Sequence, residues 1–316
     1  MGTDPKSLVE AARSGDPRSL ARLVSLVENG SPGLREAMRA VASYTGGARI
    51  IGLTGSPGVG KSTVTGALVR AYRSAGLRVA VLAVDPTSPF SGGALLGDRV
   101  RMQDHATDPG VYIRSMATRG HLGGLSVTAP QALRVLDAVG FDVICVETVG
   151  VGQAEVEIAS LADSTLVIMA PGMGDSVQAA KAGILEIADI FVVNKSDRPG
   201  AQEVVRDLRT MLAMAPAAAG GWKPPIVLAS AASGDGIGEL VDKLDKHWSW
   251  LADSGERDRR RLVRAREEVS AIAVAGIRRR IGALPGESRL DDLAALVASG
   301  KLDPISAADE LIDGRD

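Results

Sequence analysis

Cysteine is nearly absent from this sequence of 316 residues, since Cys145 is the only one. A single thiol excludes an intramolecular disulfide and a zinc site built from several cysteines, and it is typical of a reducing compartment. Aromatic residues are also scarce, at 3%. No stretch approaches the roughly 18 consecutive apolar residues of a membrane span, and the first residues lack the order of a secretory signal. The sequence therefore predicts a cytoplasmic protein whose core consists of Val, Leu, Ile and Ala.

Neither sign of charge dominates, because the formal net charge is −2. A nucleic-acid surface that depends on overall positive charge is therefore not expected. The densest charged run, 256–261, interleaves acidic and basic residues, which favours a solvated helix face over a nucleic-acid patch. The three histidines, His105, His121 and His247, are widely spaced, so a transition-metal site has little support.

The middle of the chain alternates brief β-branched runs with longer amphipathic stretches. The strands are expected at 50–54, 78–84, 111–114, 142–147, 164–169, 190–194 and 225–229. Helical patterns lie at about 61–74, 129–139, 154–161, 175–187, 201–213 and 236–251. This alternation predicts an α/β fold with a doubly wound, mostly parallel sheet, which binds ligands at the carboxyl ends of its strands.

Helical patterns without strands precede and follow this region. We expect a helical extension over residues 1–45, an α/β domain over 46–252 and a second helical extension over 253–316. The last segment has apolar residues at helical spacing after the charged run, and a final helical pair at about 288–299 and 304–312. Both extensions could pack on the α/β domain or on a second subunit.

The strongest motif follows the first predicted strand. Residues 55–62 read G-S-P-G-V-G-K-S and match the phosphate-loop pattern G-x-x-x-x-G-K-[ST] without a mismatch. Glycines let successive backbone N–H groups face an anion, and the next helix offers its positive amino-terminal end. In this pattern Lys61 reaches the β- and γ-phosphates and Ser62 gives its hydroxyl to Mg²⁺. The expected nucleotide-binding residues here are Gly55, Ser56, Pro57, Gly58, Val59, Gly60, Lys61, Ser62 and Thr63.

A second motif indicates which base is bound. A buried-strand run ends in Asn194, Lys195, Ser196 and Asp197, the N-K-x-D sequence that resembles the guanine-reading motif of GTPases. An aspartate at the last position accepts hydrogen bonds from N1–H and the N2 amine of guanine, a donor pair that adenine lacks. The motif predicts GTP over ATP. The segment 229–231 also follows an apolar strand, and its Ser230 and Ala231 are expected to contact the base.

Carboxylates end two further strands. Glu147 stands at the tip of the strand 142–147, where NTPases hold Mg²⁺, and Gly150 can offer its N–H to the γ-phosphate. Asp85 ends the second strand and is expected to orient water or to join the metal. Asp98 follows in a Gly-rich stretch that nucleotide and metal could order, although a plain helix cap or salt-bridge partner explains it as well. Metal candidates are Ser62, Asp85, Asp98 and Glu147, and catalytic candidates are Lys61, Asp85, Asp98 and Glu147.

The loop after Glu147 also bears on the rate of hydrolysis. Val151 stands where the Ras-type pattern has its water-orienting glutamine, so slow intrinsic hydrolysis is expected. Gln153 is a possible substitute, but an exposed polar loop residue is an equally good interpretation.

Five segments together resemble the MeaB/ArgK family of G-proteins, which belong to the SIMIBI class of P-loop GTPases. They are G-S-P-G-V-G-K-S at 55–62, V-D-P-T-S at 84–88, G-G-A-L-L-G-D-R-V-R-M at 92–102, E-T-V-G-V-G-Q at 147–153 and V-N-K-S-D at 193–197. The resemblance runs in order from about residue 30 to 250. The segments at 92–102 and 147–153 are far more specific to that family than a phosphate loop is.

The resemblance implies a GTPase chaperone of adenosylcobalamin-dependent methylmalonyl-CoA mutase. Such a protein binds GTP or GDP with Mg²⁺, forms a homodimer through its carboxyl-terminal helices, protects the mutase and gates the delivery of cofactor by an adenosyltransferase. It implies that Lys61 and Ser62 serve phosphate and metal, that Asp85, Asp98 and Glu147 serve the Mg²⁺ and catalytic region, and that Asn194, Lys195 and Asp197 serve the base. By the same resemblance, the segment 171–181 is a further nucleotide-responsive loop, although a Gly-rich turn also explains it.

Two other classes of function stay open on the sequence. A small-molecule kinase that transfers the γ-phosphoryl group would share the phosphate loop. A metal-delivery GTPase would share both loops but would need clustered Cys and His ligands. The client is not fixed by the residues, because a relative that serves another cobalamin-dependent acyl-CoA mutase would look similar.

Overall fold

A computed structural model describes residues 4–85, 105, 107–117, 128–148, 154–172, 185–214, 221–282 and 288–313. The chain divides into two compact units, Met1–Leu262 and Val263–Asp316, and each is described separately below. No helix within the described residues is both long enough and apolar enough to cross a membrane.

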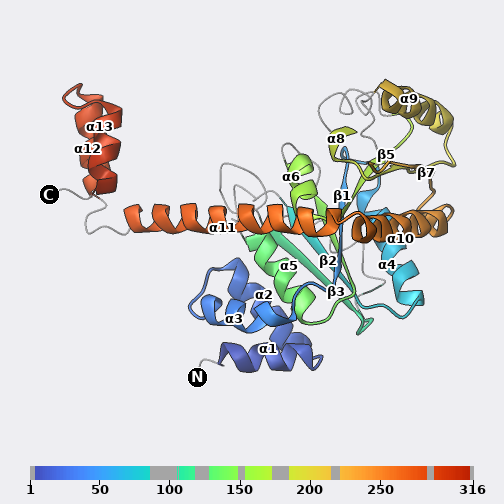
Figure 1. The fold of residues 1–316 in the computed structure, drawn as a ribbon, viewed down its shortest axis with the longest axis horizontal. Coiled ribbons are helices and arrows are strands. Elements are labelled where there is room, and N and C mark those ends of the chain that lie inside the picture. Colours follow the sequence, from blue (N-terminus) through green and yellow to red (C-terminus); the bar gives the residue numbers. More distant parts are fainter. Residues whose placement is uncertain are drawn as a thin grey trace. The chain divides into compact units, whose positions relative to one another are not determined.

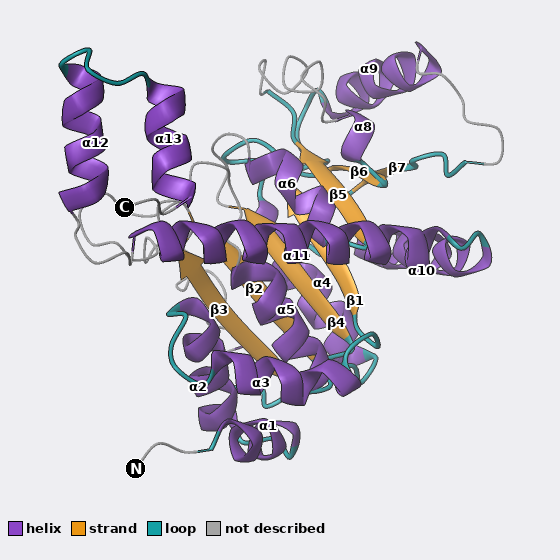
Figure 2. Cartoon of the chain, turned by 60° about the vertical axis from the view of Figure 1, so that its left-hand side comes forward, coloured by secondary structure: helices purple, strands orange, loops and turns teal. Residues whose placement is uncertain are grey.

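The first unit is built on a sheet of seven strands (Figures 1 and 2). The strands are β1 (Arg49–Thr54), β2 (Val79–Asp85), β3 (Val111–Ala117), β4 (Val143–Thr148), β5 (Ser164–Met169), β6 (Ile190–Val193) and β7 (Ile226–Leu228). Their spatial order is β3-β2-β4-β1-β5-β6-β7, and every neighbouring pair is parallel. The predicted doubly wound α/β fold is confirmed. From β1 the chain forms β2 and β3 on one side, returns to place β4 between β2 and β1, and then adds β5, β6 and β7 on the other side. The strand order thus reverses beside β1, and the carboxyl ends of β1 and its neighbours form the crevice where such sheets bind ligands.

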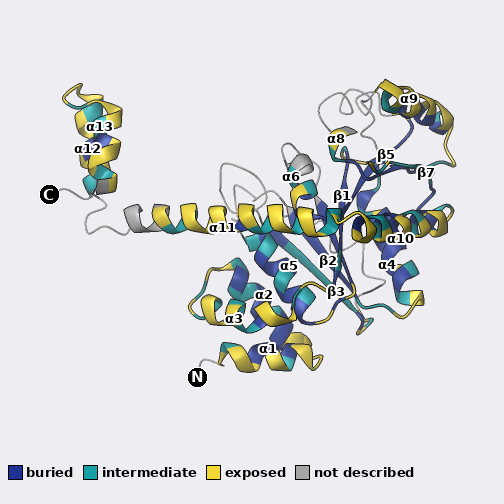
Figure 3. Cartoon of the chain, in the orientation of Figure 1, coloured by how far each residue is buried: buried dark blue, intermediate teal, exposed yellow. Residues whose placement is uncertain are grey.

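Helices cover both faces of this sheet. They are α4 (Lys61–Ser74), α5 (Thr128–Ala138), α6 (Ala154–Leu161), α8 (Leu185–Ile187), α9 (Ala201–Met214) and α10 (Ile237–Asp253). The strands are apolar on both faces, and successive side chains alternate between two cores. In β1, Ile50 packs into the core with α5 and α6, whereas Ile51 and Leu53 pack into the core with α4 and α10. Figure 3 shows the strands as the most deeply buried part of the unit.

A small group of helices extends the first of these cores. It consists of α1 (Pro5–Arg13), α2 (Pro17–Glu28), α3 (Leu34–Val41) and the 3₁₀ turn η1 (Ala42–Tyr44). Asp16 caps α2 by accepting hydrogen bonds from the backbone N–H and the hydroxyl of Ser19. Arg114 of β3 pairs with Glu28 of α2 at 2.5 Å, and Arg13 of α1 donates to the carbonyl of Ala138. These contacts fix the helices beside α5 and β3, away from the carboxyl edge of the sheet.

The second unit is entirely helical where it is described. It holds most of α11 (Glu256–Gly282) together with α12 (Ser288–Ala298) and α13 (Pro304–Asp313). Only Leu293 of α12 and Ala307 of α13 are buried apolar residues among those described here. Large apolar side chains are exposed on all three helices, namely Val263, Val269, Ile272, Val274, Ile277, Leu290, Leu296, Ile305 and Ile312. So much exposed apolar surface on a small unit is typical of a protein interface.

Candidate nucleotide-binding site

The loop between β1 and α4 has a backbone that only glycine can adopt at two positions. Gly55 has φ +140°, and a Cβ there would lie 2.2 Å from the carbonyl oxygen of Ile168. Gly60 has φ +96°, and a Cβ there would lie 2.4 Å from Nδ2 of Asn194. Gly60 is also the residue that precedes the first turn of α4. The glycines of the motif therefore let the loop pass close to β5 at one end and to the β6 loop at the other.

Lys61 opens α4 and is nine-tenths buried. Its Nζ donates to the carbonyl oxygens of Gly55 at 2.6 Å and Ser56 at 3.2 Å. The ammonium group is thereby held over the loop at the amino-terminal end of a 14-residue helix. A positive charge fixed at the amino-terminal end of a helix suits a bound phosphate.

The predicted guanine motif contacts the phosphate loop directly. Asn194 is buried, its Nδ2 donates to the carbonyl of Val59 at 2.8 Å, and its Oδ1 accepts from the backbone N–H of Ala231 at 3.1 Å. Lys195, with φ +56°, donates through Nζ to the carbonyl of Gly58 at 2.7 Å. The structure thus brings three of the predicted segments together, the loops after β1, β6 and β7.

The remaining base candidates lie in the same place. Asp197 is exposed, three residues beyond Asn194. The backbone N–H of Ser196 donates to the carbonyl of Ala229 at 3.0 Å, which joins the β6 and β7 loops. The backbone N–H of Ser230 donates to the carbonyl of Asp235, closing the β7 loop. An exposed carboxylate on a loop fixed by its neighbours can accept hydrogen bonds from a base.

Glu147 lies at the end of β4 and is only 1% exposed. Its backbone pairs with Leu53 of β1, two residues before the phosphate loop. Its Oε2 lies 2.7 Å from the hydroxyl of Thr65, a fully buried residue one turn beyond Lys61 in α4. Thr65 is not among the site residues predicted from the sequence, and its only sequence signal is that a polar residue stands four positions after the loop lysine.

The described donors suit a hard cation. Ser62 and Glu147 offer hydroxyl and carboxylate oxygens, the ligands that Mg²⁺ prefers. Asp85 is described in its backbone only, and Asp98 and Gly150 lie outside the described residues, so their predicted roles stay predictions. The segments 92–102 and 173–181 lie outside them as well. Where the structure is described, no group of three or more His, Cys, Asp or Glu side chains could hold a metal ion.

Cys145 lies two residues before Glu147 on the same face of β4 and is fully buried. Burial first, and then the charge of Glu147, raise the pKa of the Cys145 thiol to about 12. The thiol therefore stays protonated at neutral pH, and a protonated, inaccessible thiol is neither a nucleophile nor a metal ligand.

A second polar cluster lies at the opposite edge of the sheet, before β5 and β6. Asp189 accepts two hydrogen bonds from Arg260 of α11, both at 2.9 Å, and its Oδ1 lies 3.3 Å from Nε2 of the buried His247 in α10. His247 Nδ1 lies 2.8 Å from the hydroxyl of Ser164. Arg261 contacts the buried carboxylate of Asp163 at 3.4 Å.

This cluster corrects the interpretation of the run 256–261 as a solvated face. Arg259 and Asp258 are exposed, but the side chains of Arg260 and Arg261 are only 28% and 25% exposed. They turn inward because two buried carboxylates lie beneath the first turns of α11. This anchor cluster, defined as Asp163, Ser164, Asp189, His247, Arg260 and Arg261, holds α11 where the helix begins.

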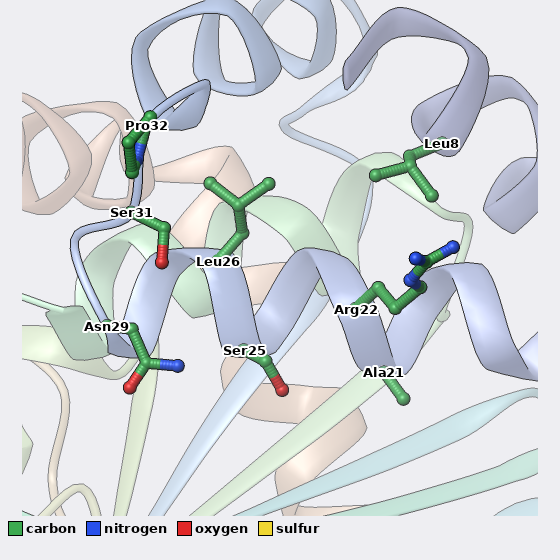
Figure 4. Close-up of a pocket in the computed structure, with 8 residues that line it drawn as sticks. All are labelled: Leu8, Ala21, Arg22, Ser25, Leu26, Asn29, Ser31 and Pro32. Atoms are coloured by element: carbon green, nitrogen blue, oxygen red, sulfur yellow. The ribbon is translucent and has the colours of Figure 1, made fainter. Parts of the chain in front are cut away.

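A pocket of about 440 Å³ lies on the amino-terminal helices (Figure 4). Leu8 of α1 faces Leu26 of α2 across it, and polar side chains such as Ser25 of α2 and Asn29, the residue after α2, line the rest. None of these residues belongs to the nucleotide site, and no motif in the sequence predicted the pocket.

A phosphate loop at the end of the first strand of a parallel sheet, tied to an N-K-x-D loop two strands away, defines a P-loop protein of the GTPase type. The family model for the methylmalonyl-CoA mutase-associated GTPase MeaB matches residues 20–284. The chain belongs to the MeaB family.

Individual relatives agree with that assignment. A Pyrococcus horikoshii protein, named as a putative GTPase, is 47% identical over 308 residues, which cover 97% of this chain and 96% of the relative. The mouse mitochondrial methylmalonic aciduria type A homolog is 34% identical over 266 residues, which cover 83% of this chain and 64% of the relative. The crystal structure of a LAO/AO transport system kinase superposes with a TM-score of 0.71 at 25% identity, and 98% of this chain and 96% of that one are covered.

Proposed function

We propose that this protein is a GTP-hydrolysing chaperone of an adenosylcobalamin-dependent acyl-CoA mutase, with methylmalonyl-CoA mutase as its client. The observation that carries the proposed GTPase activity is that the phosphate loop after β1 and the N-K-x-D loop after β6 are joined directly by hydrogen bonds. Asn194 and Lys195 donate to the carbonyls of Val59 and Gly58, and this supports a single site for the base and the phosphates of one nucleotide. The client is proposed from the family, whose name describes association with that mutase.

The roles of the chain's own residues follow from their positions. Lys61 would hold the β- and γ-phosphates at the amino-terminal end of α4, and Asp197 would accept hydrogen bonds from N1–H and the N2 amine of guanine. Ser62 and Glu147, together with Asp85 and Asp98, would hold Mg²⁺. Bound Mg²⁺ would neutralise charge on the transferred phosphoryl group. Slow hydrolysis without the client follows from Val151, which cannot orient water.

The nucleotide state would be passed to the client through the loops that follow Asp85 and Glu147. In P-loop GTPases the γ-phosphate and its metal hold such loops in one arrangement, and hydrolysis releases them. GTP binding would thus gate the loading of intact cofactor from an adenosyltransferase. The exposed apolar residues of α11, α12 and α13 support a homodimer, because a second copy could cover them.

The chaperone role is tested on the client itself. Purified methylmalonyl-CoA mutase is allowed to inactivate during turnover, alone or with this protein and GTP, and its remaining activity is followed. We expect the loss of mutase activity to slow when the protein and GTP are present, and not when ATP replaces GTP. Equal inactivation rates in all samples would contradict the proposed client, and a phosphorylated small-molecule acceptor would indicate a kinase instead.

Replacement of Asp197 by asparagine is expected to change the base preference. The amide of asparagine still accepts from N1–H, but its NH₂ group opposes the N2 amine of guanine. Loss of a charge-assisted hydrogen bond, about 1.5–3 kcal/mol, should weaken GTP binding by roughly 10- to 100-fold. Xanthosine triphosphate carries an oxygen in place of the N2 amine, so its binding should improve in the same variant.

The base preference is measured by competition of GTP, ATP and xanthosine triphosphate against a fluorescent guanine nucleotide. Asp253→Asn, an exposed change at the end of α10, is the matched control. An Asp197→Asn variant with the wild-type order of affinities would refute the assignment of the base site.

A further inference from the structure

Thr65 has no role in the phosphate-loop motif, yet it touches one of the candidate metal ligands. The residue is fully buried in the second turn of α4, and its hydroxyl lies 2.7 Å from Oε2 of Glu147. The same hydroxyl lies 3.1 Å from the carbonyl of Lys61, four residues earlier. A hydroxyl has one hydrogen to donate. The shorter contact, to a carboxylate, has the length of a charge-assisted hydrogen bond, so Thr65 donates to Glu147.

The position of Thr65 on the helix makes this contact informative. Residues three and four apart are neighbours on an α-helix, so Thr65 lies beside both Ser62 and Lys61. Glu147 comes from a different strand, 82 residues away in the chain, and reaches α4 from β4. One hydrogen bond therefore joins the helical turn that carries the phosphate and metal residues to the carboxylate on the neighbouring strand.

A glutamate side chain rotates about three bonds. If it is not held in place beforehand, it loses conformational entropy when the metal binds, and this lowers the affinity for the metal. The Thr65 side chain is itself restricted, because it is fully buried and a β-branched side chain in a helix has few rotamers. A rigid donor on the phosphate-loop helix thus limits where the carboxylate oxygen of Glu147 can lie.

We infer that Thr65 is a positioning residue for Glu147 and that it raises the affinity of the nucleotide complex for Mg²⁺. The inference rests on the proposed function, because it takes Glu147 as part of the metal site. Groups that hydrogen-bond to a metal ligand typically raise metal affinity or activity by 10- to 100-fold. A structural reading, in which the hydroxyl only satisfies a buried carboxylate, predicts an effect on stability alone.

A Mg²⁺ titration distinguishes the positioning role of Thr65 from a purely structural role. Thr65→Val keeps the shape of the side chain and removes the hydroxyl, whereas Thr65→Ser keeps the hydroxyl. Binding of a fluorescent non-hydrolysable GTP analogue is measured at increasing Mg²⁺, and the half-saturating Mg²⁺ concentration is compared. We expect it to rise about 10-fold or more in Thr65→Val and to return close to the wild-type value in Thr65→Ser.

Two further variants sharpen the test. Thr210→Val in α9 removes a hydroxyl that donates to a carbonyl four residues earlier, at 3.0 Å, without a carboxylate partner, and should leave the Mg²⁺ dependence unchanged. In a Glu147→Gln background, Thr65→Val should add no further loss of Mg²⁺ affinity, because it acts through the carboxylate. If Thr65→Val proves unstable, the comparison of Thr65→Ser with Thr65→Ala replaces it.

A wild-type protein that binds the GTP analogue without any dependence on Mg²⁺, or does not bind it at all, would overturn the proposed function and the inference with it. A wild-type protein with Mg²⁺-dependent binding, and a Thr65→Val variant with the same half-saturating Mg²⁺ but a lower melting temperature, would overturn the inference alone.

Discussion

Replacement of Lys61 by alanine is expected to lower GTP turnover by about 10²- to 10³-fold, the cost of removing one fixed donor from a developing negative charge. The physical reason lies in the placement of its ammonium group. Nζ is held by the carbonyls of Gly55 and Ser56, nine-tenths buried, where the phosphates of a nucleotide would meet the end of α4. A charge that is already fixed there needs little reorganisation when the nucleotide binds.

The measurement is the steady-state release of phosphate from GTP, together with equilibrium binding of GTP. Lys246→Ala removes an exposed lysine of α10 and is the matched control. Normal GTP hydrolysis by Lys61→Ala, in a preparation of the same purity as the control, would refute the assignment of the phosphate site.

Replacement of Asp189 by alanine is expected to reduce the free energy of unfolding by about 3 kcal/mol, at the lower end of the cost of breaking a buried ion pair. The carboxylate is 7% exposed and accepts from both terminal nitrogens of Arg260 and from the backbone N–H of Thr165. Its removal leaves a buried N–H and a half-buried guanidinium without their partner. Since Arg260 also pairs with Glu256, part of its charge stays compensated.

This loss of stability is measured by urea unfolding, followed through the fluorescence of the tryptophans. Trp222, whose indole N–H donates to the carbonyl of Asp189, reports on this region of the fold. Asp207→Ala, on the exposed side of α9, should change the free energy of unfolding by less than about 0.5 kcal/mol. An Asp189→Ala protein as stable as this control would show that the anchor cluster does not hold α11.

The carboxylate of Asp189 also makes the free energy of unfolding depend on pH, and the direction of this dependence can be predicted. Burial raises the pKa of Asp189, but hydrogen bonds from His247 and Arg260 outweigh it, and the pKa lies below its ordinary value. A carboxyl group whose pKa is lowered on folding stabilises the fold above the unfolded pKa, about 3.9, and this contribution is lost as the pH falls through the native pKa. The stability difference between wild type and Asp189→Asn should therefore be full at pH 6 and shrink below pH 4. A stability difference between the two proteins that stays constant down to pH 3 would contradict this role of the Asp189 carboxylate.

Much of the fold follows from local sequence. The predicted helix over 61–74 and the predicted strand over 164–169 have the observed bounds, because a phosphate loop fixes the start of the first and the second lies between Asp163 and Pro171. The strand β3 was expected to end at residue 114 but continues to Ala117. Its later residues, including Arg114, Ser115 and Met116, mix polar and apolar types, which is typical of an edge strand with few neighbours.

The contacts within the candidate site needed the structure. The N-K-x-D segment follows a strand, and from this its position near the phosphate loop could be expected. The sequence does not predict that Asn194 and Lys195 bind particular carbonyls of that loop. The link between Thr65 and Glu147 depends on the register of β4 against β1, which no local pattern encodes. The inward turn of Arg260 was missed for the same reason, because its partner Asp189 precedes a strand 71 residues earlier.

On the proposed function, the loops after β1 and β6 form a GTP site whose turnover serves a cobalamin-dependent mutase. The most direct test is phosphate release from GTP by the purified protein at low micromolar concentration, with and without methylmalonyl-CoA mutase, with ATP as the control nucleotide. We expect slow turnover of GTP by the protein alone, a faster turnover when the mutase is added, and no comparable turnover of ATP. Turnover of ATP as fast as that of GTP, or GTP turnover that the mutase leaves unchanged, would contradict the proposed function.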